Sequence, residues 1–167
     1  MLFRSDKMII AKNFDMLLYG FEKAYSKLEE MSMSLGKYNE NDAFYIIGTS
    51  IHWAIDCYER IEKAEILNEE DKSRVSALRF ANNCLKHNVS FFDFQRKTEG
   101  ATFPQSLDGS GRFWHYEWKD LNDINDSRYQ KQKNNYDKIL KGKSILYTFR
   151  EDLKIIKEYQ ENLNRNL

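Results

Sequence analysis

The sequence predicts an all-α fold, a bundle of four or five helices that carries one aromatic-rich, irregular insertion with a short β-hairpin. One proline and seven glycines in 167 residues leave few helix breakers, which favours long helices. Apolar residues recur at steps of three and four over most of the chain, as on one face of a helix. Only residues 90–125 break this pattern. The length fits a single helical-bundle domain over residues 1–167.

The first predicted helix covers about residues 6–35 and has a near-heptad apolar stripe. Ser32 is the one polar member of that stripe. Gly20 interrupts the helix at a cost of about 1 kcal/mol relative to alanine. Gly36 and Asn39 then supply stop signals, so we expect the helix to end before them.

The second helix should begin near Asn41 or Asp42, and its apolar face is wide enough for a central place in the bundle. Residues 65–71 form the next turn, in which Asn68 is a good N-cap. The acidic residues after Asn68 suit the positive end of a helix dipole. We therefore expect the third helix over about residues 69–88.

Aromatic residues dominate the insertion at 90–125. The stretches "VSFFDF" and "RFWHYEW" flank a run of turn residues, and the second alternates with period two, which predicts short extended segments. Packing in the core or an interface is the favoured role of these rings, and stacking on bases is the alternative. Two further helices are predicted over about residues 126–141 and 144–164, with Gly142 as the stop between them.

Polar residues gather on the third predicted helix, in the stretch "RFANNCLKHN". Arg79, Asn83, Lys86 and His87 fall within an arc of about 100° beside the apolar stripe. Asn82 projects into the stripe itself, where its amide would need a buried partner. Because the cluster adjoins the core and uses poor helix formers, it is a candidate functional site.

These side chains suit phosphodiester chemistry that needs no metal. An imidazole can take or give a proton near neutral pH, so His87 is the candidate acid or base. Arg79 would hold the scissile phosphate and stabilise the charge that develops on it. Asn83 would position the phosphate, and Lys86 and Asn82 would add RNA-binding contacts.

An all-α bundle with Arg79, Asn83 and His87 on its third long helix resembles the HEPN superfamily. Members are often metal-independent endoribonucleases of toxin–antitoxin, abortive-infection and other antiviral systems. Their signature is an arginine followed by a histidine, at a spacing slightly shorter than the one here, and Phe80 stands where a polar residue is usual.

The resemblance implies how such a protein would act. Two copies of the chain would form a homodimer whose paired motifs make one RNA-cleaving cleft. The neighbouring 2′-hydroxyl would attack the phosphate and leave a cyclic phosphate. No cofactor would be needed, and an antitoxin or another defence protein would be a possible partner.

Other interpretations of the cluster stand beside this one. Lys86 and His87 lie near the negative end of the helix dipole, and Asn88 could be the C-terminal cap, so the cluster could be purely structural. It could also be a non-catalytic binding site. For the whole chain, the alternative to an RNA-binding protein is a dimerisation or interaction module with the aromatic insertion as its docking surface.

A metal site is a weaker hypothesis. His52 and Asp56 are four residues apart and could place two ligands on one helix face, with His87 or His115 as a further ligand. No other spacing supports this, so a His–Asp hydrogen bond is the favoured interpretation and we expect no metal.

The composition limits which partners and which cell compartments we expect for this chain. Basic and acidic residues balance at 26 each, which predicts no strongly basic nucleic-acid surface overall, although a local patch is compatible with it. Cys57 and Cys84 form no disulfide framework. The chain shows no apolar run that could cross a membrane and no signal peptide at its start. We therefore expect a cytoplasmic protein.

Overall fold

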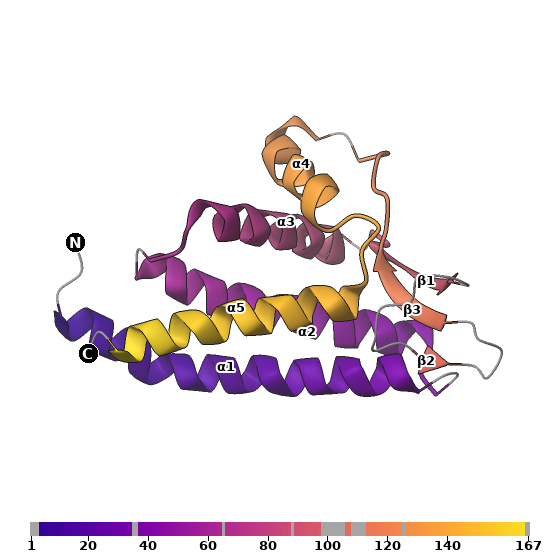
Figure 1. Ribbon diagram of the computed structural model, residues 1–167. Helices are drawn as coiled ribbons and strands as arrows, with labels where there is room; N and C mark the ends of the chain where they lie inside the picture. Colours follow the sequence, from indigo (N-terminus) through magenta and orange to yellow (C-terminus); the bar gives the residue numbers. More distant parts are fainter. Residues whose placement is uncertain are drawn as a thin grey trace.

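The fold is the predicted helical bundle with a small antiparallel sheet at one end (Figure 1). The computed structural model describes residues 4–34, 37–64, 66–87, 89–97, 106–107, 113–124 and 126–165. The elements follow the order α1 (Arg4–Met33), α2 (Glu40–Lys63), α3 (Glu69–Lys86), β1 (Phe92–Lys97), β2 (Ser106–Leu107), β3 (Phe113–Trp118), the 3-10 helix η1 (Ser127–Tyr129), α4 (Gln130–Ile139) and α5 (Ile145–Arg165).

The long helices form the body of the molecule. α2 packs against α1, α3 and α5, which confirms its predicted central place, and α1 also packs along α5. The short α4 lies against α3 on the outer side of the bundle (Figure 1). The sheet sits at the end where α1 and α3 finish and α2 and α5 begin, so the start of α1 and the end of α5 lie at the opposite end.

Local capping explains where the helices begin. Asn68 accepts a hydrogen bond from the Asp71 backbone N–H, as predicted for the start of α3. Asn39, which we expected to end the first helix, instead begins the second: its side chain and that of Asp42 form a reciprocal capping box. α2 therefore starts at Glu40, slightly earlier than predicted.

The structure explains two unusual residues of the first helix, one by a tertiary contact and one by a bond within the helix. A Cβ atom added at Gly20 would lie 2.6 Å from the ring of Trp53, so the glycine allows that indole to pack directly on the α1 backbone. Ser32 is buried in the stripe and donates to the Leu28 carbonyl at 2.8 Å, which satisfies its hydroxyl within the helix.

The insertion forms a three-stranded sheet in the order β1-β3-β2. β1 and β3 pair antiparallel, with Phe92 opposite Trp118. The indole of Trp118 is buried and donates to Thr148 Oγ1 on α5 at 2.9 Å. Gly142, at φ +73°, donates its N–H to the Trp118 carbonyl, so the predicted stop residue also ties the α4–α5 connection to β3.

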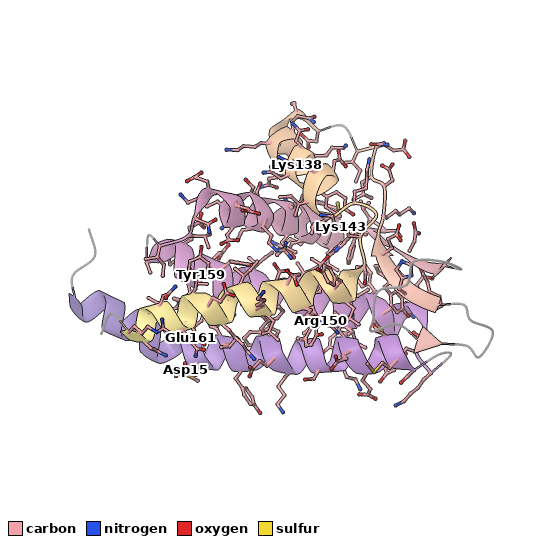
Figure 2. The ribbon with its side chains drawn as sticks, in the orientation of Figure 1. Asp15, Lys138, Lys143, Arg150, Tyr159 and Glu161 are labelled. Atoms are coloured by element: carbon pink, nitrogen blue, oxygen red, sulfur yellow. The ribbon has the colours of Figure 1, made fainter. Side chains whose placement is uncertain are left out.

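Polar links also cross the bundle. Tyr159 on α5 reaches the start of α3 (Figure 2), where its hydroxyl donates to Asp71 Oδ2 at 2.7 Å and accepts from the Asn68 N–H at 3.1 Å. Deeper inside, the carboxylate of Asp152 accepts hydrogen bonds from Tyr58 and Arg74. These bonds join α2, α3 and α5 at specific positions, because the donors and acceptors have to meet within hydrogen-bond distance.

Candidate functional site

The predicted cluster occupies the C-terminal half of α3, on the edge of that helix between α2 and α4. Arg79 faces α2. Its Nη2 atom donates to Glu62 Oε2 at 2.8 Å and to Glu59 Oε1 at 3.3 Å, and its side chain remains 33% exposed. Partial burial acts to lower the pKa of Arg79, but the bonds to the two carboxylates outweigh it and raise the pKa. Arg79 is thus a fixed, charged group at the surface.

Asn83 faces α4 instead. Its Nδ2 donates to Gln132 Oε1 at 3.1 Å, and two turns earlier on α3 the Oγ of Ser76 accepts a hydrogen bond from Asn135 of α4 at 3.0 Å. The ring of Phe80 packs on Tyr136 of α4 with centroids 5.3 Å apart. α4 therefore covers one flank of the cluster, a contact that the helical periodicity of either segment did not reveal.

His87 and Lys86 are both exposed at the end of α3. His87 is the C-cap residue, and its backbone N–H donates to the Asn83 carbonyl at 3.1 Å. Under the purely structural interpretation the cap could have been Asn88, which lies outside the described residues. The cap uses only the His87 backbone, so its imidazole stays at the surface.

Asn82 has a buried side-chain oxygen, Oδ1, that lacks a hydrogen-bond donor among the described residues. A buried carbonyl oxygen without a donor costs roughly 1–3 kcal/mol. The sequence indicated that this amide would need a buried partner, and within the described ranges none is present.

The cluster is one strip along α3 whose members have different neighbours. Arg79 is held by α2, Asn83 by α4, and His87 stands at the helix end. A second feature involves the aromatic insertion, for which base stacking and partner docking were alternatives to core packing. Ser90, three residues after His87, lines a cleft of about 470 Å³ between the α1–α2 connection and the sheet. The period-two aromatic pattern of the insertion was the available signal.

The residues considered for metal binding come from two different surroundings, an exposed part of α2 and the buried strand β3. His52 and Asp56 are exposed on α2, while His115 is buried on β3 and contacts Glu117 Oε2 through Nε2 at 2.9 Å. Across the described part of the chain, no group of three His, Cys, Asp or Glu side chains is arranged to hold a metal ion. Within the same residues, no helix combines the length and the apolar character needed to cross a bilayer.

Comparison of the chain with protein-family models, with curated proteins and with solved structures finds no match. The proposal for its function therefore rests on the side chains of the α3 strip and their surroundings.

Proposed function

We propose that this chain is an HEPN-like RNA-binding protein that cleaves RNA without a metal, in a toxin–antitoxin or antiphage defence system. The observation that carries the proposal is the exposed imidazole of His87 at the end of a strip that also contains Asn83 and the charged Arg79. An imidazole, an amide and a guanidinium supply proton transfer, positioning and charge stabilisation, which are the three needs of phosphodiester cleavage.

In the proposed reaction the 2′-oxygen of the RNA attacks the adjacent phosphorus, and the bond from phosphorus to the 5′-oxygen breaks. The 2′-hydroxyl loses its proton and the leaving 5′-oxygen gains one, and the imidazole of His87 performs one of these transfers. The products are a 2′,3′-cyclic phosphate and a 5′-hydroxyl. A second copy of the chain would supply the other imidazole.

Glu59 and Glu62 already bind Arg79, which limits the N–H groups that Arg79 can offer to a phosphate. Both contacts use Nη2, and a guanidinium has five N–H donors in total. The proposal therefore assigns phosphate binding to the N–H groups of Nε and Nη1. The two carboxylates would fix the orientation of the guanidinium, and they would also weaken its attraction for a phosphate.

The decisive experiment compares two exposed histidines. Purified wild-type, His87→Ala and His52→Ala proteins are incubated with total RNA in EDTA. We expect the wild type and His52→Ala to cleave the RNA, and His87→Ala to lose at least 100-fold in rate, since general acid–base catalysis contributes about 10²–10⁴-fold. The melting temperatures of all three should agree, because both imidazoles are exposed. Equal cleavage by His87→Ala would reject the assignment.

A second candidate function, a dimerisation module, is favoured by a different observation. Met16 and Tyr45 are each 72% exposed and lie with Tyr19 around an apolar groove of about 390 Å³ between α1 and α2. Exposed apolar groups that gather in this way mark interaction surfaces. Intact RNA in the experiment above, together with a dimer mass by light scattering, would favour the module.

A further inference from the structure

The cleft beside the end of α3 has an aromatic wall. Phe92 and Phe94 lie two residues apart on β1, and Phe94 pairs directly with Tyr116 on β3, so the three rings share one face of the sheet. The ring centroids of Phe94 and Tyr116 are 4.8 Å apart, and those of Phe92 and Tyr116 are 5.9 Å apart. All three rings line the cleft, and Phe94 is 47% exposed.

The opposite wall and the rim are polar. The α1–α2 connection contributes Tyr38 and Asn39, the start of α2 contributes Glu40, and the segments that flank the sheet contribute Ser90 and Lys119. Tyr38 is already engaged, since its hydroxyl donates to Glu30 Oε1 at 2.7 Å and Lys27 and Lys37 approach its ring. The charged groups on the cleft are therefore Lys119, Glu40 and Asp93 of β1.

We propose that this cleft binds an unpaired nucleobase of single-stranded RNA. Base faces stack on aromatic rings, and this is the main way in which proteins hold single-stranded nucleic acid. The cleft volume of about 470 Å³ lies in the usual range for small-molecule sites. Lys119 on the rim supplies a positive charge for the phosphate that accompanies the base.

The carboxylates give the site a base preference. A carboxylate accepts hydrogen bonds from the amino groups of bases, and it repels groups that offer only acceptors. Glu40 is exposed at the cleft, at the first position of α2. Adenine, cytosine and guanine each carry an exocyclic amino group, whereas uracil carries none. The cleft should therefore bind adenosine monophosphate more tightly than uridine monophosphate.

Position links the cleft to the strip on α3. Ser90 lines the cleft and follows His87 by three residues, so the two Cα atoms lie at most roughly 11 Å apart. A strand whose base occupies the cleft would have its next phosphates near the end of α3. The assignment of RNA as the natural ligand rests on the proposed function, whereas the binding of a base by the cleft can be tested alone.

The test is a titration of the full chain with adenosine monophosphate and, separately, with uridine monophosphate, in EDTA. Backbone amide shifts in nuclear magnetic resonance spectra report the binding site. We expect the shifts to centre on Ser90, Phe92 and Tyr116. Tyr116→Leu removes the ring and keeps an apolar side chain, so it should weaken binding about tenfold. Tyr45→Leu is the matched control, because that exposed tyrosine lies outside the cleft.

Further variants separate the possible outcomes. Phe94→Leu repeats the test if Tyr116→Leu fails to fold, and Glu40→Gln should reduce the preference for adenosine over uridine monophosphate. Unchanged binding by the folded ring variants, or shifts elsewhere, would overturn the proposal. So would Tyr116-dependent binding of a lysine-rich peptide with no binding of nucleotide, since aromatic rings beside carboxylates also suit cations.

The same titration keeps this proposal distinct from the proposed function. His87→Ala should bind adenosine monophosphate as the wild type does. A protein that binds the nucleotide in the cleft and cleaves no RNA would support the base site and reject the nuclease. A protein that cleaves RNA in a His87-dependent way and binds no nucleotide in the cleft would do the reverse.

Discussion

Asp152 is the residue on which the interior depends most directly. Its side chain is 0% exposed, and its Oδ1 atom accepts hydrogen bonds from Arg74 on α3 and from Tyr58 on α2, the latter at 2.8 Å. Burial raises the pKa of Asp152, while the guanidinium of Arg74 and the Tyr58 hydroxyl partly oppose that shift. Arg74 also donates to the Thr148 carbonyl at 3.0 Å. The charge of Arg74 is therefore matched inside the bundle.

Replacing this carboxylate should be costly. Asp152→Ala leaves the mostly buried guanidinium of Arg74 without its counter-charge, and we expect the free energy of unfolding to fall by roughly 3 kcal/mol. Urea denaturation followed by circular dichroism measures it. Glu161→Ala is the control, because it breaks an exposed ion pair with Arg165 and should change stability little. Similar losses in both variants would show that the buried pair has no special weight.

The candidate site residues show that the tertiary partners of a side chain cannot be predicted from its position on a helix alone. The sequence indicated that Arg79, Asn83 and His87 share one side of a helix, and they do lie along one strip of α3. It did not indicate that two carboxylates of α2 bind Arg79, or that Gln132 binds Asn83. Those partners are far away along the chain, so only the packing of α2 and α4 on α3 brings them within reach.

At the scale of elements, Tyr136 fastens α4 to both the bundle and the sheet. It is fully buried, its ring packs on Phe80 of α3, and its hydroxyl donates to the Lys119 carbonyl at 2.8 Å. The Phe91 carbonyl lies 3.4 Å from the same hydroxyl. The Tyr136 hydroxyl thus supplies a donor to the Lys119 carbonyl, while the Phe91 carbonyl accepts from the Lys119 N–H at 3.0 Å.

Removal of that hydroxyl should loosen this end of the molecule. Tyr136→Phe keeps the ring and leaves the Lys119 carbonyl without the donor that the tyrosine supplies, so we expect a loss of about 1–2 kcal/mol. Hydrogen exchange should accelerate at the Lys119 amide, which donates to the Phe91 carbonyl. Tyr147→Phe, at an exposed tyrosine of α5, should leave both quantities unchanged. Unaltered exchange at Lys119 in Tyr136→Phe would contradict this account.

Apolar periodicity and helix capping located the helices well, because both depend on residues that are close in the sequence. They placed the start of α3 and its N-cap at Asn68 as the structure has them. Asn39 shows the limit of such signals. An asparagine suits both the end of one helix and the start of the next, and its reciprocal bonds with Asp42 decide for the start of α2.

At the scale of the whole molecule, burial in the folded chain favours the neutral, protonated form of several ionisable side chains. Burial raises the pKa of Cys57 to about 12 and that of Cys84 to about 11, and Asp56 adds to the shift of Cys57. Burial likewise raises the pKa of Tyr159 to about 12. All three side chains belong to the packed helices, so their deprotonation competes directly with folding.

Stability should therefore fall in alkali. A group whose pKa is higher in the folded chain than in the unfolded chain stabilises the fold below its unfolded pKa, and this contribution disappears as pH rises toward the folded value. For the cysteines that window runs from about pH 9 to pH 12. We expect the urea midpoint to decline from pH 9 to pH 11. The double variant Cys57→Ala, Cys84→Ala should decline less, and a constant wild-type midpoint would refute the prediction.

The sequence by itself determined the helical class, the approximate extents of the helices, the N-cap at Asn68 and the aromatic hairpin, because these follow from periodicity and from contacts between near neighbours. Only the tertiary structure decided the partners of Arg79 and Asn83, the reason for Gly20, and the cleft beside Ser90. Each of these joins segments that are distant in the chain, and the way helices and strands pack on one another sets such contacts.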